Sequence, residues 1–147
     1  MKINSTHGSL AMDTWKQSSI AGNLAFSQKR YHEAEQHYKL ASQRAQQLLW
    51  LWFDAEEIIT ALVISFQNMA ELYFMQSRHH DGLNQYQQLS DLLLRYQRKC
   101  DSEETEQTLA LACQRAGTEL LFTLQELKLE SEYAIKVVQQ FTHPKLA

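Results

Sequence analysis

The stretch from residue 19 to residue 41, SIAGNLAFSQKRYHEAEQHYKLA, decides the fold because small and large side chains recur in it at helical spacings. Gly22 and Ala34 are small and lie on either side of a polar segment centred near residue 29. If two antiparallel helices meet at that segment, Gly22 and Ala34 fall where the backbones approach most closely, and Tyr38 fills the groove beside them. The stretch therefore predicts a helical hairpin with a defined contact face.

The same pattern recurs 48 residues further along the chain. The large and polar residues that match are Phe26 with Phe74, Gln28 with Gln76, Arg30 with Arg78 and Tyr38 with Tyr86. The small residues that match are Gly22 with Ala70 and Ala34 with Gly82. Self-similarity at a fixed interval is typical of repeat proteins. We therefore expect a first hairpin over about residues 13–53 and a second over about residues 54–99.

Capping signals predict where the later helices begin. Asp54 and Glu57 have the spacing of a capping box ahead of a third helix. Asp101 and Ser131 are suited to cap a fifth and a sixth helix, which gives a third hairpin over residues 102–142. This third hairpin lacks small and aromatic residues at the spacing of the repeat, and terminal repeats are often atypical in this way.

The composition indicates a single all-helical domain. Of the 147 residues, 44% are hydrophobic and 21% are charged, and there are only four Gly and one Pro. Because helix breakers are scarce, the chain favours helices over sheets. We predict one all-α domain over residues 13–143. Residues 1–12 mix polar and small residues without periodicity, so we expect them to form a flexible leader.

The charge and hydropathy patterns argue against nucleic acid and membranes as partners. The formal net charge is −3, so there is no overall basic field to attract phosphates. The most apolar run, Ile58 to Phe66, is too short to span a bilayer, and the first residues lack the apolar segment of a secretory signal. We expect a cytoplasmic protein.

The residues that carry chemistry do not form a catalytic pattern. Cys100 and Cys113 are the only cysteines and make no CxxC pair. Glu33 and His37 lie four apart, but no second Glu-x-x-His pair completes a metal site of the bundle type. There is no nucleophile elbow and no phosphate-binding loop. The sequence predicts a protein that is not an enzyme and that has no cofactor or metal.

Gly22, Tyr31, Ala34, Tyr38 and Ala41 resemble the tetratricopeptide repeat (TPR) consensus at its most diagnostic positions. The resemblance implies a right-handed stack of three antiparallel hairpins, six helices in all. The interval of 48 exceeds the family's usual interval of about 34, so some helices should be longer than the consensus. In size and repeat number the chain also resembles small TPR chaperones of bacterial type III secretion, and small bacterial TPR-like proteins with no assigned role.

In the TPR family the first helix of each hairpin lines a concave groove that holds a peptide or a partner helix. The resemblance therefore implies candidate partner-binding residues on those helices. In the first hairpin they are Lys16, Ser19, Asn23, Phe26 and Ser27. In the second they are Ile64, Gln67, Glu71, Phe74 and Met75. Because the third helix is central, an internal position for Phe74 and Met75 is an open alternative.

A clamp for the carboxylates of chaperone tails is not supported. Asn23 matches the Asn that chaperone-binding members use, but the Lys expected beside it is Ser19 here. In the second hairpin Glu71 would repel a carboxylate. The remaining groove, with its Gln and aromatic residues, suits hydrogen bonding to an extended or helical peptide.

Two functions of different kinds follow. The first is a protein–protein interaction module, an adaptor or a chaperone-like protein, that binds another protein or peptide in the groove. The second is an assembly protein that homodimerises through apolar helix faces, such as the segment LLWLWF at residues 48–53. We expect most of that segment to be buried.

Overall fold

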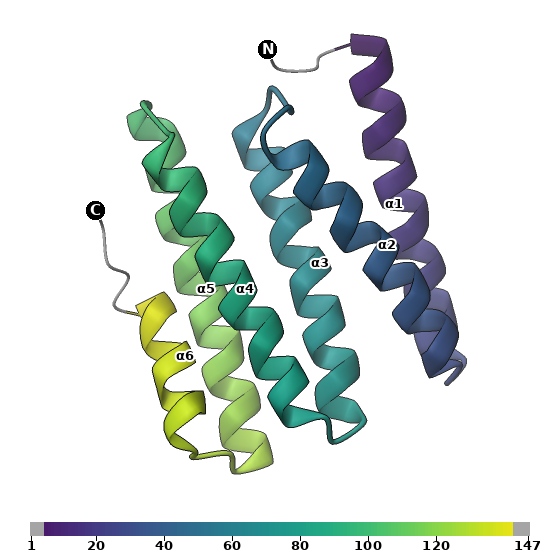
Figure 1. Ribbon diagram of the computed structural model, residues 1–147, viewed down its shortest axis with the longest axis vertical. Helices are drawn as coiled ribbons and strands as arrows, with labels where there is room; N and C mark the ends of the chain where they lie inside the picture. The colour runs from purple at the N-terminus through teal and green to yellow at the C-terminus, as the bar shows by residue number, and fades with distance from the viewer. Residues whose placement is uncertain (1–4, 143–147) are drawn as a thin grey trace.

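The computed structural model describes residues 5–142, and their backbone is helical apart from the connecting turns. The six helices are α1 (Ser5–Ser27), α2 (Tyr31–Leu49), α3 (Ala55–Met75), α4 (His79–Arg98), α5 (Glu103–Leu127) and α6 (Glu132–Thr142) (Figure 1). The predicted all-α class is confirmed.

Consecutive helices lie side by side and run in opposite directions (Figure 1). The helices α1 and α2, α3 and α4, and α5 and α6 pack against each other, each pair joined by a short turn. Helix α3 also packs on α2 and on α5, and α4 packs on α5 and α6. Helix α3 therefore holds the centre of the molecule.

The first two turns repeat the same backbone geometry 48 residues apart. Lys29 and Ser77 have left-handed backbones, with φ of 62° and 61°. The residue that follows each of them returns a backbone hydrogen bond to the preceding helix, from Arg30 N to the Ala25 carbonyl and from Arg78 N to the Tyr73 carbonyl, both 2.8 Å long. The repeat predicted from the sequence is thus visible in the backbone.

The contact predicted for the first hairpin is present. Ala34 is fully buried, and a Cβ atom added at Gly22 would overlap the ring of Tyr38. In the second hairpin the glycine is Gly82 on the second helix, at the position that matches Ala34, and an added Cβ would lie 2.7 Å from Cε1 of Phe74. Small residues therefore allow the two helices of each pair to approach around an aromatic ring.

Helix α1 begins earlier than the sequence predicts. The expected flexible leader is wrong for residues 5–12, which form the first two turns of α1, while residues 1–4 lie outside the described residues. The physical reason is that Met12 extends the buried stripe of α1 toward the N-terminus, three residues before Trp15. The indole nitrogen of Trp15 donates a hydrogen bond of 2.7 Å to Ser65 Oγ and ties α1 to α3.

The most apolar parts of the chain lie at the centre of the molecule and in one connection. Helix α3 is long and apolar enough to cross a membrane by length and composition, but 61% of its most apolar window is buried within this fold. In the segment 48–53, only Leu48, Leu49 and Trp52 are buried. The expectation of burial fails for the other residues of this segment because α2 ends at Leu49 and the chain turns at the surface.

Candidate functional site

Helix α3 leaves one stripe of its surface uncovered between α1 and α5. Its residues follow one another at steps of three or four, as residues on one side of a helix do, while most of the remaining helix is buried. Residues of α1 and α5 continue the surface on both sides. We call it the odd-helix face and define it by Lys16, Asn23, Ile64, Gln67, Glu71, Met75, Leu111, Arg115, Glu119 and Phe122.

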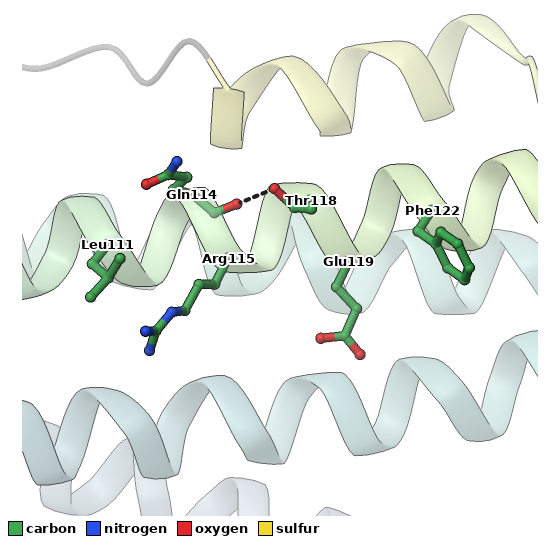
Figure 2. A pocket seen from close by; sticks show the side chains of 6 residues that line it. All are labelled: Leu111, Gln114, Arg115, Thr118, Glu119 and Phe122. Carbon is green, nitrogen blue, oxygen red and sulfur yellow. Dashed lines mark hydrogen bonds between the residues drawn. The ribbon is translucent and has the colours of Figure 1, made fainter.

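Two shallow hollows open on the odd-helix face. The first lies between α1 and the first half of α3 and is lined by Met12, Trp15, Lys16, Asp54, Glu56, Glu57, Thr60 and Ile64. The second lies along α5, where Arg115 and Glu119 extend toward α3 between Leu111 and Phe122 (Figure 2). Both hollows combine apolar and charged side chains.

Two carboxylates meet where α3 and α5 face each other. Gln67 Nε2 donates a hydrogen bond of 3.0 Å to Glu119 Oε2. Partial burial raises the pKa of Glu71 above its ordinary value, and the negative charge of Glu119 raises it further. In the part of the chain that the structure describes, no Lys or Arg nitrogen lies within 4.0 Å of either carboxylate. Neither carboxylate therefore forms an ion pair among the described residues, and the nearest cation along α5 is Arg115, one helical turn before Glu119.

Tyr38 connects the odd-helix face to the core. Its hydroxyl group donates a hydrogen bond of 2.7 Å to Asn23 Oδ1. Burial raises the pKa of Tyr38 to about 12, and the charge of Glu71 contributes to the same shift. Tyr38 is thus neutral at physiological pH and fixes the orientation of the Asn23 side chain.

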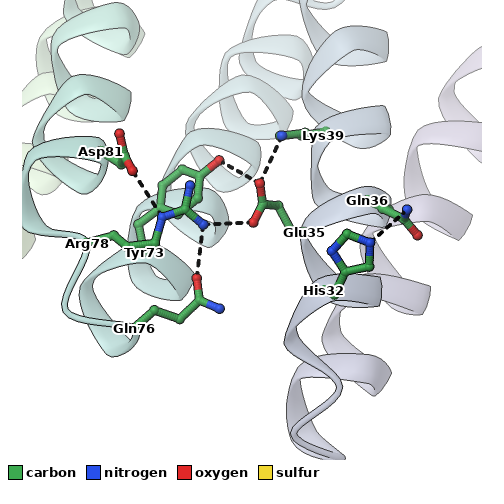
Figure 3. A network of polar contacts seen from close by, with 8 residues as sticks. All are labelled: His32, Glu35, Gln36, Lys39, Tyr73, Gln76, Arg78 and Asp81. Atoms are coloured by element: carbon green, nitrogen blue, oxygen red, sulfur yellow. Dashed lines mark hydrogen bonds and ion pairs between the residues drawn. The ribbon is translucent and has the colours of Figure 1, made fainter.

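A second polar cluster, between α2 and the turn that joins α3 to α4, has its charges paired (Figure 3). The carboxylate of Glu35 accepts hydrogen bonds from Lys39 Nζ at 2.9 Å, Arg78 Nη1 at 3.0 Å and the Tyr73 hydroxyl at 3.3 Å. Arg78 also donates through Nε to Asp81 Oδ2 at 3.0 Å. Because its charges are satisfied within the chain, this cluster acts as a joint between the first two helix pairs.

The structure places the predicted partner-binding residues in two groups. Lys16, Asn23, Gln67 and Glu71 lie on the odd-helix face, together with Ile64 and Met75. Phe26 is half-buried at the first turn, where its ring packs edge-on against Tyr31 with centroids 5.8 Å apart. Ser27 is exposed, and its hydroxyl group donates to the Leu24 carbonyl.

The prediction that Ser19 and Phe74 face the binding groove is wrong, because each residue is only 7% exposed. Ser19 continues the side of α1 that carries Trp15, which faces α3. The ring of Phe74 fills the space that Gly82 leaves on α4. An internal position was the open alternative for both Phe74 and Met75. It holds for Phe74, whereas Met75 is exposed.

The contribution of α5 to the odd-helix face was missed by the sequence analysis. Leu111, Arg115, Glu119 and Phe122 follow one another at steps of four, four and three residues, beside the stripe of α5 that enters the core. That spacing indicates that the four residues share one side of the helix. It could not be connected to the first two hairpins because the third lacks small and aromatic residues at their spacing.

Among the residues that the structure describes, no three His, Cys, Asp or Glu side chains gather as they would around a metal ion. A protein-family model described as "protein of unknown function (DUF2753)" matches residues 13–144. Comparison with curated proteins and with solved structures gives no match.

Proposed function

We propose that this chain, which belongs to the DUF2753 family of proteins of unknown function, is a protein-interaction module that binds a peptide or a partner helix on the odd-helix face. The observation that carries the proposal is the uncovered stripe of α3. This is the central helix of the molecule, yet it presents to solvent Ile64, which lines the first hollow, and Met75 near its end. Exposed apolar side chains within a polar surface are typical of interaction sites.

The repeat geometry supports a TPR-like description of the fold. The turns at Lys29 and Ser77 share their backbone hydrogen bonds, and Gly22 meets Tyr38 as the TPR resemblance implies. In TPR proteins the first helices of the hairpins line the binding groove, and these correspond to α1, α3 and α5. On this basis we assign an adaptor or chaperone-like role in the cytoplasm, without a cofactor and without nucleic acid or membrane as a partner.

A pair of matched variants tests the binding surface. Ile64 on the odd-helix face is 37% exposed, and Leu40 on α2 is 40% exposed. We expect wild type and Leu40→Asp to capture the same partner from an extract of the native cells, and Ile64→Asp to lose it. Circular dichroism should show the same helix content in all three proteins. If both variants retain the partner, the odd-helix face is not the binding surface.

Homodimerisation is a second candidate function that one observation favours. Leu10, Ile20 and Leu24 lie on the side of α1 that faces away from the other helices and are 67%, 66% and 54% exposed. A second copy of the chain could cover this side and so turn the molecule into an assembly unit. Measurement of the mass in solution tests it. A dimer that Ile20→Asp converts to a monomer supports assembly, and a monomeric wild type refutes it.

A further inference from the structure

The charges of the odd-helix face and its two hollows restrict the kind of partner that they fit. Carboxylates outnumber cations on these surfaces. The carboxylates are Asp54, Glu56, Glu57, Glu71 and Glu119, and the cations are Lys16 and Arg115. An acidic or phosphorylated partner would therefore meet repulsion, whereas a cationic partner would meet complementary charge.

The carboxylates of Glu71 and Glu119 give the strongest reason to expect a cationic partner. They come from different helices, α3 and α5, so the packing of the fold brings them together. Gln67 holds Glu119 in place through its hydrogen bond of 3.0 Å. Neither carboxylate is paired with a cation among the described residues, in contrast to Glu35, which is paired with both Lys39 and Arg78.

Apolar side chains stand next to this pair of charges. On α3, Ile64 precedes Glu71 by seven residues, which corresponds to two helical turns or about 10 Å. On α5, Leu111 and Phe122 are 45% and 60% exposed on either side of Glu119. Along α3, Gln67 stands between Ile64 and Glu71, and along α5, Arg115 stands between Leu111 and Glu119. The face thus carries apolar residues on both sides of a polar and charged centre.

We infer that the partner presents a cationic amphipathic helix, with a Lys or Arg side chain between Glu71 and Glu119 and apolar side chains beside Ile64. The inference rests on the proposed function and specifies the partner of the same face. A second copy of this chain does not fit the description. Its most exposed apolar helix side, on α1, is formed by Leu10, Ile20 and Leu24, and Lys16 is the single Lys or Arg of that helix.

The desolvation of Glu71 gives the inference a second readout. Because the folded protein raises the pKa of this carboxyl group, its charged form is disfavoured by folding. Removal of the charge should leave the melting temperature unchanged or raise it. A residue that costs stability in the free protein and contributes to binding is typical of a functional site.

Two peptides and two double variants provide the test. The probes are a 16-residue amphipathic helix of Leu and Lys, and the same pattern with Glu in place of Lys. The site variant combines Glu71→Gln with Glu119→Gln. The control variant combines Asp101→Asn with Glu130→Gln, which removes the same charge at exposed positions in the connections before α5 and α6. Fluorescence anisotropy at physiological salt measures each affinity.

We expect the Lys peptide to bind wild type and the control variant with affinities within about twofold of each other, and the site variant at least about tenfold more weakly. The Glu peptide should not bind. Equal losses in the site and control variants, or equal binding of the two peptides, would overturn the inference. If Ile64→Asp abolishes capture of the cellular partner while the site variant retains it, the inference fails and the proposed function stands. If neither variant affects capture, both fail.

Discussion

At the scale of single residues, Tyr38 carries two tasks that meet in one side chain. Its ring covers Gly22 and thereby sets the distance between α1 and α2. Its hydroxyl group holds Asn23 at the edge of the odd-helix face. A change in the packing of the first helix pair will therefore be felt on the candidate binding surface as well.

Ala34 provides the most direct test of this packing. It is fully buried in the contact between α1 and α2, so Ala34→Leu should lower the free energy of unfolding by about 1 to 3 kcal/mol through overpacking. Urea unfolding measures the change. Ala110→Leu on the exposed side of α5 is the matched control and should have little effect. Equal stability of the two variants would mean that the helix contact is not where the structure places it.

The residues of the helix contact could be predicted from the sequence, whereas the rotation of each helix about its axis could not. Gly22, Ala34 and Tyr38 were identified because their spacing specifies a contact by itself. Ser19 and Phe74 were wrongly predicted to be exposed. Successive residues of a helix are separated by about 100° of rotation, so one position decides between the groove and the core.

At the scale of secondary-structure elements, the cluster around Glu35 joins the first helix pair to the second. The matching arginine of the first turn, Arg30, contacts Gln28 and pairs with Glu33 at 2.8 Å, just as Arg78 contacts Gln76 and pairs with Asp81. Only Arg78 also reaches a carboxylate on another helix pair. Both turns of the repeat thus have the same local contacts of an arginine. Only in the second turn does this arginine also connect two helix pairs.

This difference predicts unequal effects of two identical substitutions. Arg78→Ala leaves Glu35, whose side chain is only 16% exposed, without one of its partners, whereas Arg30→Ala removes contacts at the surface. We expect Arg78→Ala to lower the free energy of unfolding by about 1 kcal/mol more than Arg30→Ala does. Denaturant titration of the two variants is the measurement. Equal losses would show that the joint contributes no stability.

The same joint should give the protein a pH-dependent stability. Burial raises the pKa of Glu35, but hydrogen bonds and charges from Lys39 and Arg78 outweigh it and leave the pKa below its ordinary value of 4.5. The stabilisation is therefore complete above pH 4.5 and is lost as the pH falls through the lower pKa of the folded state. The stability difference between wild type and Glu35→Gln should shrink from about pH 7 to about pH 3. A difference that stays constant over this range would contradict the assignment.

Helix identity was easier to predict than helix boundaries. Asp54 and Ser131 cap α3 and α6 as expected, since each side chain accepts from the amide three residues further on. The start of α1 was missed because residues 1–12 show no hydrophobic periodicity, whereas Met12 packs in the core in the structure. The role of α5 was missed because the small and aromatic residues of the third pair, such as Gly117 and Phe141, do not stand at the spacing of the first two.

At the scale of the whole molecule, stability should be highest along α3. This helix contacts α2, α4 and α5, whereas α6 contacts only α4 and α5 among the neighbours with extensive packing. Hydrogen exchange measured by mass spectrometry should therefore show the slowest amides between Ile58 and Leu72, and faster exchange in α6. If α6 exchanges as slowly as α3, the molecule opens as one unit and the centre has no special stability.

The left-handed backbones at Lys29, Ser77 and Lys128 have a practical consequence. Each of these residues carries a Cβ atom in a conformation that glycine adopts without penalty. The backbone at every chain reversal between paired helices is therefore strained at this residue. Glycine at each position should add about 1 kcal/mol, and the triple variant should resist heat measurably better without touching any binding residue. Calorimetry of the triple variant would show whether this reserve of thermostability exists, and a lowered transition temperature would show that it does not. The three reversals are therefore the first places to strengthen this scaffold for engineering.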